Sequence, residues 1–257
     1  MNGKIKTLSL FLLISCLLFS CREETGKLSI RFTASVDDKT LVFNEMKYKN
    51  ASDNEYSIDE IQYFISDLML TNKGGNKYEI VRDKIHYVDH AIPSTLKWNI
   101  TDIFPVGEYR SLTFIFGLSQ ERNVSKFFVN PPERDMFWPD ILGGGYHYMK
   151  INGKWKHDED GVKPLNIHTG ISRLISQDSL ISYTHNFFTV ILSDVKFEIQ
   201  KDKTTEIVLD MNVNQWFTNP NNFDFNNYGT GIMENDKAQK ILQENGKQNV
   251  FRLFLHE

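Results

Sequence analysis

Apolar and polar residues alternate along much of this 257-residue chain. Leu28, Ile30 and Phe32 alternate with polar neighbours, and the same spacing recurs in later segments. A period of two places one set of side chains on the buried face of a β-strand. We therefore expect strands at residues 28–32, 61–69, 78–88, 112–116, 195–199, 207–213 and 250–255, with Gly74 and Gly75 turning the second strand back into the third.

One segment has helical spacing instead. Within residues 233–244, Ala238, Ile241 and Leu242 share one side of a helix, and Asn245-Gly246 is a typical helix stop. Many strands at short spacing, a single helix and no βαβ alternation predict an all-β fold. The fold we expect is an antiparallel β-sandwich with one short C-terminal helix, in one domain.

The N-terminus has the pattern of a secretion signal. Lys4 and Lys6 precede an apolar run over residues 8–19, which is shorter than the roughly 20 residues that a transmembrane helix needs. The run ends in Leu18-Phe19-Ser20-Cys21, which resembles the lipobox of bacterial lipoproteins. We expect residues 1–20 to be a lipoprotein signal peptide and Cys21 to carry the lipid. The alternative is an ordinary cleaved signal with an incidental cysteine.

This interpretation divides the chain and gives it a location. Residues 21–26 become a lipidated tether, and residues 27–257 form the folded domain. We expect an outer membrane lipoprotein, on the periplasmic face or the cell surface, held to the membrane through the lipid on Cys21.

Composition excludes several classes of site. The two cysteines are Cys16, in the signal, and Cys21, so the folded domain has no thiol for disulfides, thiolate metal sites or catalysis. The net charge is only −4, and no basic stripe marks the chain as a nucleic-acid binder. The sequence has no nucleophile elbow, zinc-protease helix, phosphate-binding loop or dinucleotide fingerprint. We therefore expect no enzyme and no nucleic-acid partner.

Histidines are the best candidate metal ligands, since imidazole, thioether and carboxylate are the ligand types left. Alternation through residues 146–151 would put His147 and Met149 on one face of a further strand, and His168, in the segment 164–170, is expected at a strand end. We expect His147 and His168 to bind a metal, with His86 third. For each residue the alternative is a half-buried histidine that serves the structure.

A glycine-rich loop, Gly143 to Gly145, lies among aromatic residues. Three glycines permit tight backbone curvature. One hypothesis is a pocket formed by Trp138, Tyr146, Met149 and Trp155 that holds an apolar or sugar-like ligand. The alternative is an aromatic corner of the core.

Several motifs together resemble the MbnP-like copper-binding family, which is common among Bacteroidetes lipoproteins. The motifs cover roughly residues 28 to 255 and are Tyr63-Phe64-Ile65-Ser66-Asp67-Leu68, His86-Tyr87-Val88-Asp89, Pro105-Val106-Gly107-Glu108-Tyr109, Met136-Phe137-Trp138-Pro139, Gly143 to Lys150, Asn166-Ile167-His168-Thr169-Gly170 and Trp216-Phe217.

The resemblance implies a secreted or lipid-anchored β-sandwich, some of whose relatives bind copper. In those relatives, histidines hold the metal near a tryptophan that a partner di-haem enzyme oxidises to kynurenine. Their ligands lie early in the domain, whereas this chain has neither His nor Trp between Cys21 and Ile85. Copper would therefore have to be held by later residues.

Our first hypothesis is a non-enzymatic, lipid-anchored protein that binds copper through His147 and His168, helped by His86 or Met149. Capture by neutral imidazoles would weaken as the pH falls through about 6.5. The second hypothesis is a surface module that binds a protein or glycan partner and no metal. Histidines within reach of one ion favour the first, whereas scattered histidines beside an exposed aromatic patch favour the second.

Overall fold

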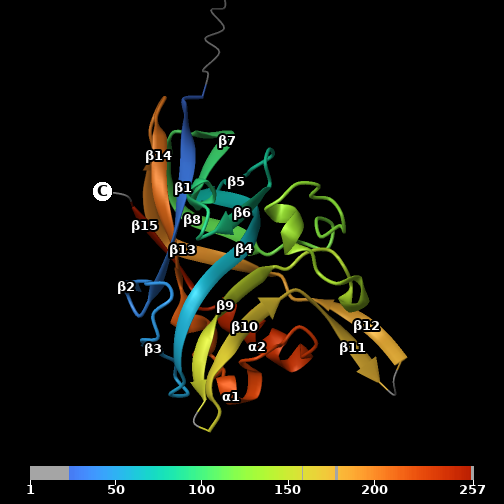
Figure 1. Cartoon of the computed structure of the whole chain (residues 1–257). Helices are drawn as coiled ribbons and strands as arrows, with labels where there is room; N and C mark the ends of the chain where they lie inside the picture. Colours follow the sequence, from blue (N-terminus) through green and yellow to red (C-terminus); the bar gives the residue numbers. More distant parts are fainter. Residues whose placement is uncertain (1–22, 158, 177–178, 256–257) are drawn as a thin grey trace, which may run out of the picture.

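The computed structural model describes residues 23–157, 159–176 and 179–255. The predicted signal peptide, residues 1–20, and Cys21 lie outside the described residues. Two β-sheets and a projecting two-stranded hairpin make up most of the described chain (Figure 1). No helix among the described residues is long and apolar enough to cross a membrane.

The first sheet is built on β1. One edge of β1 pairs with β14, which also pairs with β15, and the other edge pairs with β2 and β7. The β1–β14 pair is parallel, with Phe32 opposite Leu209, and is an exception in an otherwise antiparallel arrangement. The strands of this sheet are β1 (Thr25–Val36), β2 (Lys39–Thr40), β7 (Lys97–Pro105), β14 (Thr204–Asn212) and β15 (Phe251–Leu255).

The long strand β4 (Glu55–Asn72) organises the second sheet. Along one edge β4 pairs with β9 and then β8, and along the other with β3, β6 and β5. The outer strand β10 pairs with β9, and β13 pairs with β8. These strands are β3 (Tyr48–Lys49), β5 (Lys77–Glu79), β6 (Ile85–Asp89), β8 (Gly107–Phe116), β9 (Met149–His157), β10 (Gly161–Thr169) and β13 (Phe188–Ile199).

The main core contains buried residues from both sheets, including Phe32, Tyr63, Leu209 and Met149. A smaller core includes Phe64, Trp138, Tyr146 and Tyr148. Neighbouring residues of a strand point to opposite faces, so Tyr63 and Phe64 place the two cores on opposite faces of the second sheet. The connection at residues 117–148 therefore covers the face that the sandwich leaves open.

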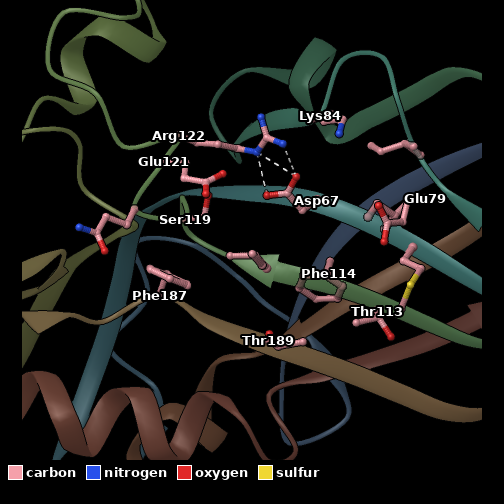
Figure 2. Close-up of a pocket in the computed structure, with 15 residues that line it drawn as sticks. Asp67, Glu79, Lys84, Thr113, Phe114, Ser119, Glu121, Arg122, Phe187 and Thr189 are labelled. Carbon is pink, nitrogen blue, oxygen red and sulfur yellow. Dashed lines mark hydrogen bonds and ion pairs between the residues drawn. The ribbon is translucent and has the colours of Figure 1, made fainter.

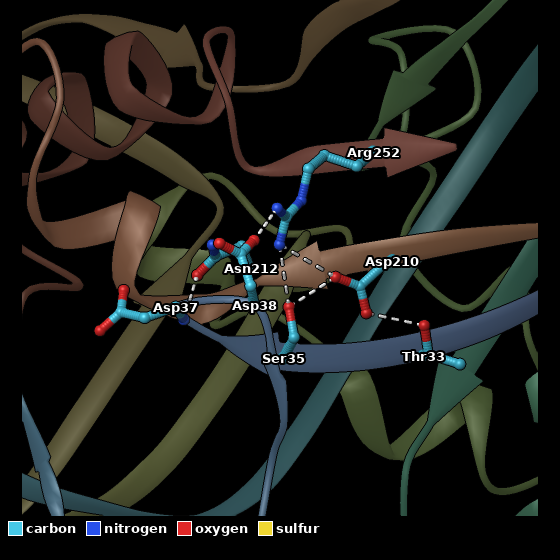
Figure 3. A network of polar contacts seen from close by, with 7 residues as sticks. All are labelled: Thr33, Ser35, Asp37, Asp38, Asp210, Asn212 and Arg252. Carbon is cyan, nitrogen blue, oxygen red and sulfur yellow. Dashed lines mark hydrogen bonds and ion pairs between the residues drawn. The ribbon is translucent and has the colours of Figure 1, made fainter. Parts of the chain in front are cut away.

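A polar network stabilises the outward face of the parallel β1–β14 pair (Figure 3). Asp210 accepts hydrogen bonds from Thr33 Oγ1 at 2.7 Å and Ser35 Oγ at 2.5 Å. Arg252 of β15 lies 3.7 Å from the same carboxylate and also pairs with Asp38. Phe32 and Leu209 alternate with these residues and face the core, which explains the period of two seen in the sequence.

The predicted all-β sandwich is confirmed, and some element bounds differ. The C-terminal helix α2 is Asp236–Gly246 rather than 233–244, and it begins where Asn235 caps the Ala238 backbone N–H. A four-residue helix, α1 (Phe225–Tyr228), was not expected. The segment 78–88 is two strands, β5 and β6, rather than one. The projecting hairpin consists of β11 (Ile171–Ser176) and β12 (Ser179–His185).

Candidate metal centre

The candidate site lies at one end of the β9–β10 hairpin. His147 comes two residues before β9, and His168 is the second-last residue of β10, opposite Lys150. The segment carrying Met136 and Trp138 passes over this end, because His147 N donates to Met136 O at 2.7 Å. Antiparallel pairing thus brings together two histidines that are 21 positions apart in the chain.

The two imidazole rings lie edge to face. Their centroids are 5.2 Å apart and their planes are 80° from parallel. Trp138 lies on another side of His147, with ring centroids 4.7 Å apart. His147 is only 6% exposed, and His168 is half-buried.

Hydrogen bonds fix which nitrogen of each ring carries the proton. His147 Nδ1 lies 3.0 Å from Met136 O, a carbonyl that can only accept, so Nδ1 donates and Nε2 keeps its lone pair. This Nε2 is buried and has no hydrogen-bond partner among the described residues. A buried nitrogen without a partner is costly in a folded protein and needs an explanation.

His168 is oriented by a comparable relay. Its Nε2 lies 2.6 Å from Asn152 Oδ1. Asn152 in turn donates through Nδ2 to the carboxylate of Glu60, which fixes the amide with its oxygen towards His168. Therefore His168 Nε2 donates and Nδ1 keeps the lone pair. Metal-binding histidines typically donate their second N–H to such an acceptor.

Both rings are held neutral by their surroundings. Burial lowers the pKa of His147 to about 3, and the nearby positive charge of Lys150 acts in the same direction. Burial and Lys150 likewise lower the pKa of His168 to about 4. Lys150 is itself held in place, since its Nζ donates to Asp135 O at 3.0 Å. At neutral pH each ring therefore offers a lone pair and no charge.

This donor set fits a soft, low-charge metal ion better than a hard divalent one. No group of three or more His, Cys, Asp or Glu residues in the described part of the chain is placed to hold a metal. The site therefore offers two neutral imidazoles next to the positive charge of Lys150. Hard divalent ions need carboxylate oxygens, whereas copper accepts imidazole nitrogen.

Comparison with known proteins decides the family. The sequence model of the MbnP family matches residues 25–234. The chain belongs to the MbnP family. Its structure is similar to that of MbnP from Methylosinus trichosporium, with a TM-score of 0.59, 15% sequence identity, and coverage of 91% of this chain and 100% of the other. At this identity the structural likeness shows a shared fold. No curated protein matches the chain.

The MbnP match ends before α2, yet α2 supports the candidate site. Gln239 of α2 donates through Nε2 to the backbone oxygen of His168 at 2.8 Å and accepts from Gly170 N at 3.2 Å. The end of β10 is therefore fixed by a helix beyond the matched residues.

His86, the third predicted ligand, does not join this pair. It is stacked between Phe32 and Trp98, with ring centroids 5.1 and 5.0 Å away, and its Nε2 donates to Thr95 O at 2.8 Å. Met149 is fully buried in the main core, whereas Trp138, next to His147, belongs to the smaller one. In this MbnP-family chain, His86 and Met149 therefore contribute to packing and are not part of the candidate metal centre.

The predicted aromatic pocket is also divided between the two cores. Trp138 and Tyr146 belong to the smaller core and Met149 and Trp155 to the main one, and all four are buried. Tyr146 does line a hollow of about 610 Å³, together with Phe128, Val129 and Phe137. The glycine loop curves as expected, since Gly143, Gly144 and Gly145 all have positive φ.

Sequence reasoning missed Met136, Asn152 and Lys150 as part of the site. Lys150 and Asn152 alternate with Met149 and Ile151 along β9, so a period of two places them on the outward face of the strand, where Lys150 is opposite His168. His147 precedes the strand, so this alternation does not place it. Nothing in the sequence pattern indicates the backbone carbonyl of Met136.

A separate polar cleft of about 800 Å³ lies between β4, β8 and the start of the 117–148 connection (Figure 2). At its rim Arg122 Nε lies 2.8 and 2.7 Å from the two oxygens of Asp67. Asp67 has a φ of 51° and lies where the β4–β8 register shifts, so a bulge turns its carboxylate towards Arg122. This ion pair ties the connection to β4.

Proposed function

We propose that this protein is a non-enzymatic, lipid-anchored envelope protein that binds copper, as Cu(I), between His147 and His168. The bare, buried Nε2 of His147 beside a second neutral imidazole carries the proposal. Family membership supports it, because copper is the metal that the family resemblance implies.

Each residue of the site has a defined part in this binding. His147 Nε2 and His168 Nδ1 supply the lone pairs, while Met136 O and Asn152 Oδ1 hold the two rings in the required tautomers. Burial, with the positive charge of Lys150 acting in the same direction, keeps both rings unprotonated. Lys150 also disfavours further positive charge, so a monovalent ion is preferred to a divalent one. Burial by Trp138 keeps competing water away from His147.

A competition titration tests the proposal. Cu(I) is titrated under reducing, anaerobic conditions against a chromophoric Cu(I) chelator, for the wild type and for four variants: His147→Ala, His168→Ala, Asn152→Ala and His86→Ala. We expect one ion per chain, a loss of about 100-fold or more in affinity for the first two variants, and about tenfold for Asn152→Ala. His86→Ala is the matched control and should bind like the wild type.

Two results would contradict the site. The wild type could fail to bind Cu(I), or the His147→Ala/His168→Ala double variant could bind as tightly as the wild type. Equal losses of Cu(I) affinity in His86→Ala and His147→Ala would point to general destabilisation of the fold. Circular dichroism of each variant shows whether it is folded.

The membrane anchor is part of the same proposal and has its own test. We propose acylation of Cys21, on the strength of the apolar run and the small residue that precede it. In a cell that processes lipoproteins, Cys21→Ser should release the protein from the membrane fraction. Cys16→Ser, which leaves the lipobox intact, should remain there. Release of both variants, or of neither, would contradict acylation of Cys21.

A partner di-haem enzyme stays a prediction of the family resemblance. If such an enzyme acts on this protein, we expect Trp138 to be the residue oxidised, because its ring centroid lies 4.7 Å from that of His147. Trp98 and Trp155 also lie beside histidines, His86 and His157, but neither histidine belongs to the proposed centre. Trp216 lies beside Phe116. Mass spectrometry of the peptide containing Trp138, from protein purified from its native cells, would detect its conversion to kynurenine.

A further inference from the structure

The hollow lined by Tyr146 is a pocket built almost entirely from one connection between strands. About 610 Å³ in volume, it lies within residues 125–146, and its apolar wall consists of Phe128, Val129, Phe137 and Tyr146. This volume is within the range of small-molecule sites, which are mostly apolar with a few polar groups.

The apolar wall is preformed. Tyr146 and Phe128 lie edge to face with ring centroids 4.9 Å apart, and the Phe128 backbone N–H donates to the Tyr146 hydroxyl at 2.8 Å. Phe128 also stacks on Phe64 of β4, at 5.3 Å and nearly parallel. Phe128 and Tyr146 are thus fixed against the second sheet, and a ligand would not need to order this part of the wall first.

Two residues of this apolar wall have side chains that are exposed to solvent. Val129 is 71% exposed and Phe137 is 58% exposed. Covering large apolar side chains with an apolar ligand group is favourable in proportion to the area removed from water. The occupant should therefore have an apolar side chain or ring.

The charged residues that line the pocket indicate which charged groups the ligand should carry. Arg134 and Asp135 pair with each other at 3.0 Å. Lys126 and Asp140 also line the pocket, and neither side chain has a hydrogen-bond or ion-pair partner within residues 23–157, 159–176 and 179–255. One free cation and one free anion complement a molecule that carries both charges.

We propose that this pocket binds a small apolar zwitterion, that is, an apolar α-amino acid or a short apolar peptide. The carboxylate of the ligand pairs with Lys126, its ammonium pairs with Asp140, and its side chain packs against Phe128, Val129 and Phe137. This binding does not require copper, because none of these residues supplies a lone pair to the metal centre.

Calorimetric titration of the full protein, with metal chelated, tests this with four probes. L-phenylalanine and the dipeptide Phe-Leu carry both charges, 3-phenylpropionate lacks the ammonium, and phenethylamine lacks the carboxylate. We expect both zwitterions to bind and each single-charge analogue to bind about tenfold more weakly than phenylalanine.

Charge variants assign the two contacts. Lys126→Gln should weaken phenylalanine binding to the level of phenethylamine, and Asp140→Asn should weaken it to the level of 3-phenylpropionate. Lys77→Gln in β5 removes a positive charge outside the pocket lining and should change nothing. The proposal is overturned if neither zwitterion binds, if the single-charge analogues bind as well as phenylalanine, or if Lys126→Gln and Asp140→Asn bind like the wild type.

Discussion

His147 and His168 lie edge to face, with ring centroids 5.2 Å apart, and each donates one N–H to a fixed oxygen. Their remaining nitrogens are therefore neutral lone-pair donors before any metal arrives. This relationship underlies the copper proposal, and it changes the pH dependence that the sequence alone suggests.

Copper affinity should be nearly constant between pH 7 and pH 5. An ordinary histidine would be protonated as the pH falls through about 6.5. Burial instead lowers the pKa of His147 to about 3 and that of His168 to about 4, so protons compete with the metal only near and below pH 4. Competition titrations at pH 7, 6 and 5, with the chelator calibrated at each pH, measure this. A steady loss of affinity that begins at pH 6.5 would contradict it.

The free energy of unfolding of the metal-free protein should fall as the pH drops below about 6.5. Burial lowers the pKa of His86 and His90 to about 4 in the folded state, whereas the unfolded chain takes up protons near 6.5. Each such histidine therefore stabilises the fold above pH 6.5 and loses up to about 1.4 kcal/mol per pH unit below it.

His86→Phe isolates one of these contributions. Phenylalanine keeps the stacking between Phe32 and Trp98 but cannot be protonated. The variant should be about 1 kcal/mol less stable at pH 7, because Thr95 O loses its donor. Its stability should then fall less steeply than that of the wild type between pH 6 and 4.5. Urea unfolding at several pH values gives the free energy of unfolding of each protein as a function of pH. An equal dependence on pH in the wild type and the variant would show that protonation of His86 does not contribute.

Removing the Asp210 carboxylate should destabilise the first sheet. Asp210→Ala leaves Thr33 and Ser35 without their acceptor, and we expect a loss of about 2–3 kcal/mol. Asp38→Asn is the control, because Asp38 pairs with the same Arg252 but its side chain is 77% exposed, and asparagine tolerates the φ of 67° at this position. That change should cost less than about 1 kcal/mol. Denaturant midpoints that rank the two variants in the opposite order would contradict the network.

Gly153 should resist substitution because β9 approaches β4 closely at this position. A Cβ on Gly153 would lie 2.0 Å from the backbone oxygen of Ser57, which cannot move without disturbing β4. Gly153→Ala should cost about 2 kcal/mol or more. Gly161→Ala is the control: its φ of 74° makes alanine unfavourable by about 1–2 kcal/mol, but nothing lies within 4 Å of its Cβ position. Thermal unfolding measures the loss of stability in both variants. A smaller loss for Gly153→Ala than for Gly161→Ala would contradict the close approach of β9 to β4.

The sequence predicted most strands because a period of two survives wherever one face is buried, as along Leu28, Ile30 and Phe32. It could not predict that β1 and β14 are parallel, since residue spacing carries no information about which distant strands pair or in which direction. The segment 78–88 divides in two because β4 pairs with its two halves at separate places.

The sequence indicated the two histidines that the structure brings together, and it did not indicate the residues that surround them. His147 and His168 were identified from their positions next to strands. The expected neighbour Met149 turns into the main core, because strand β9 begins only at Met149 and the alternation does not extend back to His147. Glu60, which orients Asn152, lies 92 positions away in the chain, and only the β4–β9 pairing brings the two together.

The most direct test of the copper centre is a crystal of the protein loaded with Cu(I), measured on both sides of the copper absorption edge. The anomalous difference map should show one strong peak between His147 Nε2 and His168 Nδ1, within copper–nitrogen bonding distance of both atoms. A peak at His86 or elsewhere, with none at this pair, would contradict the proposed centre.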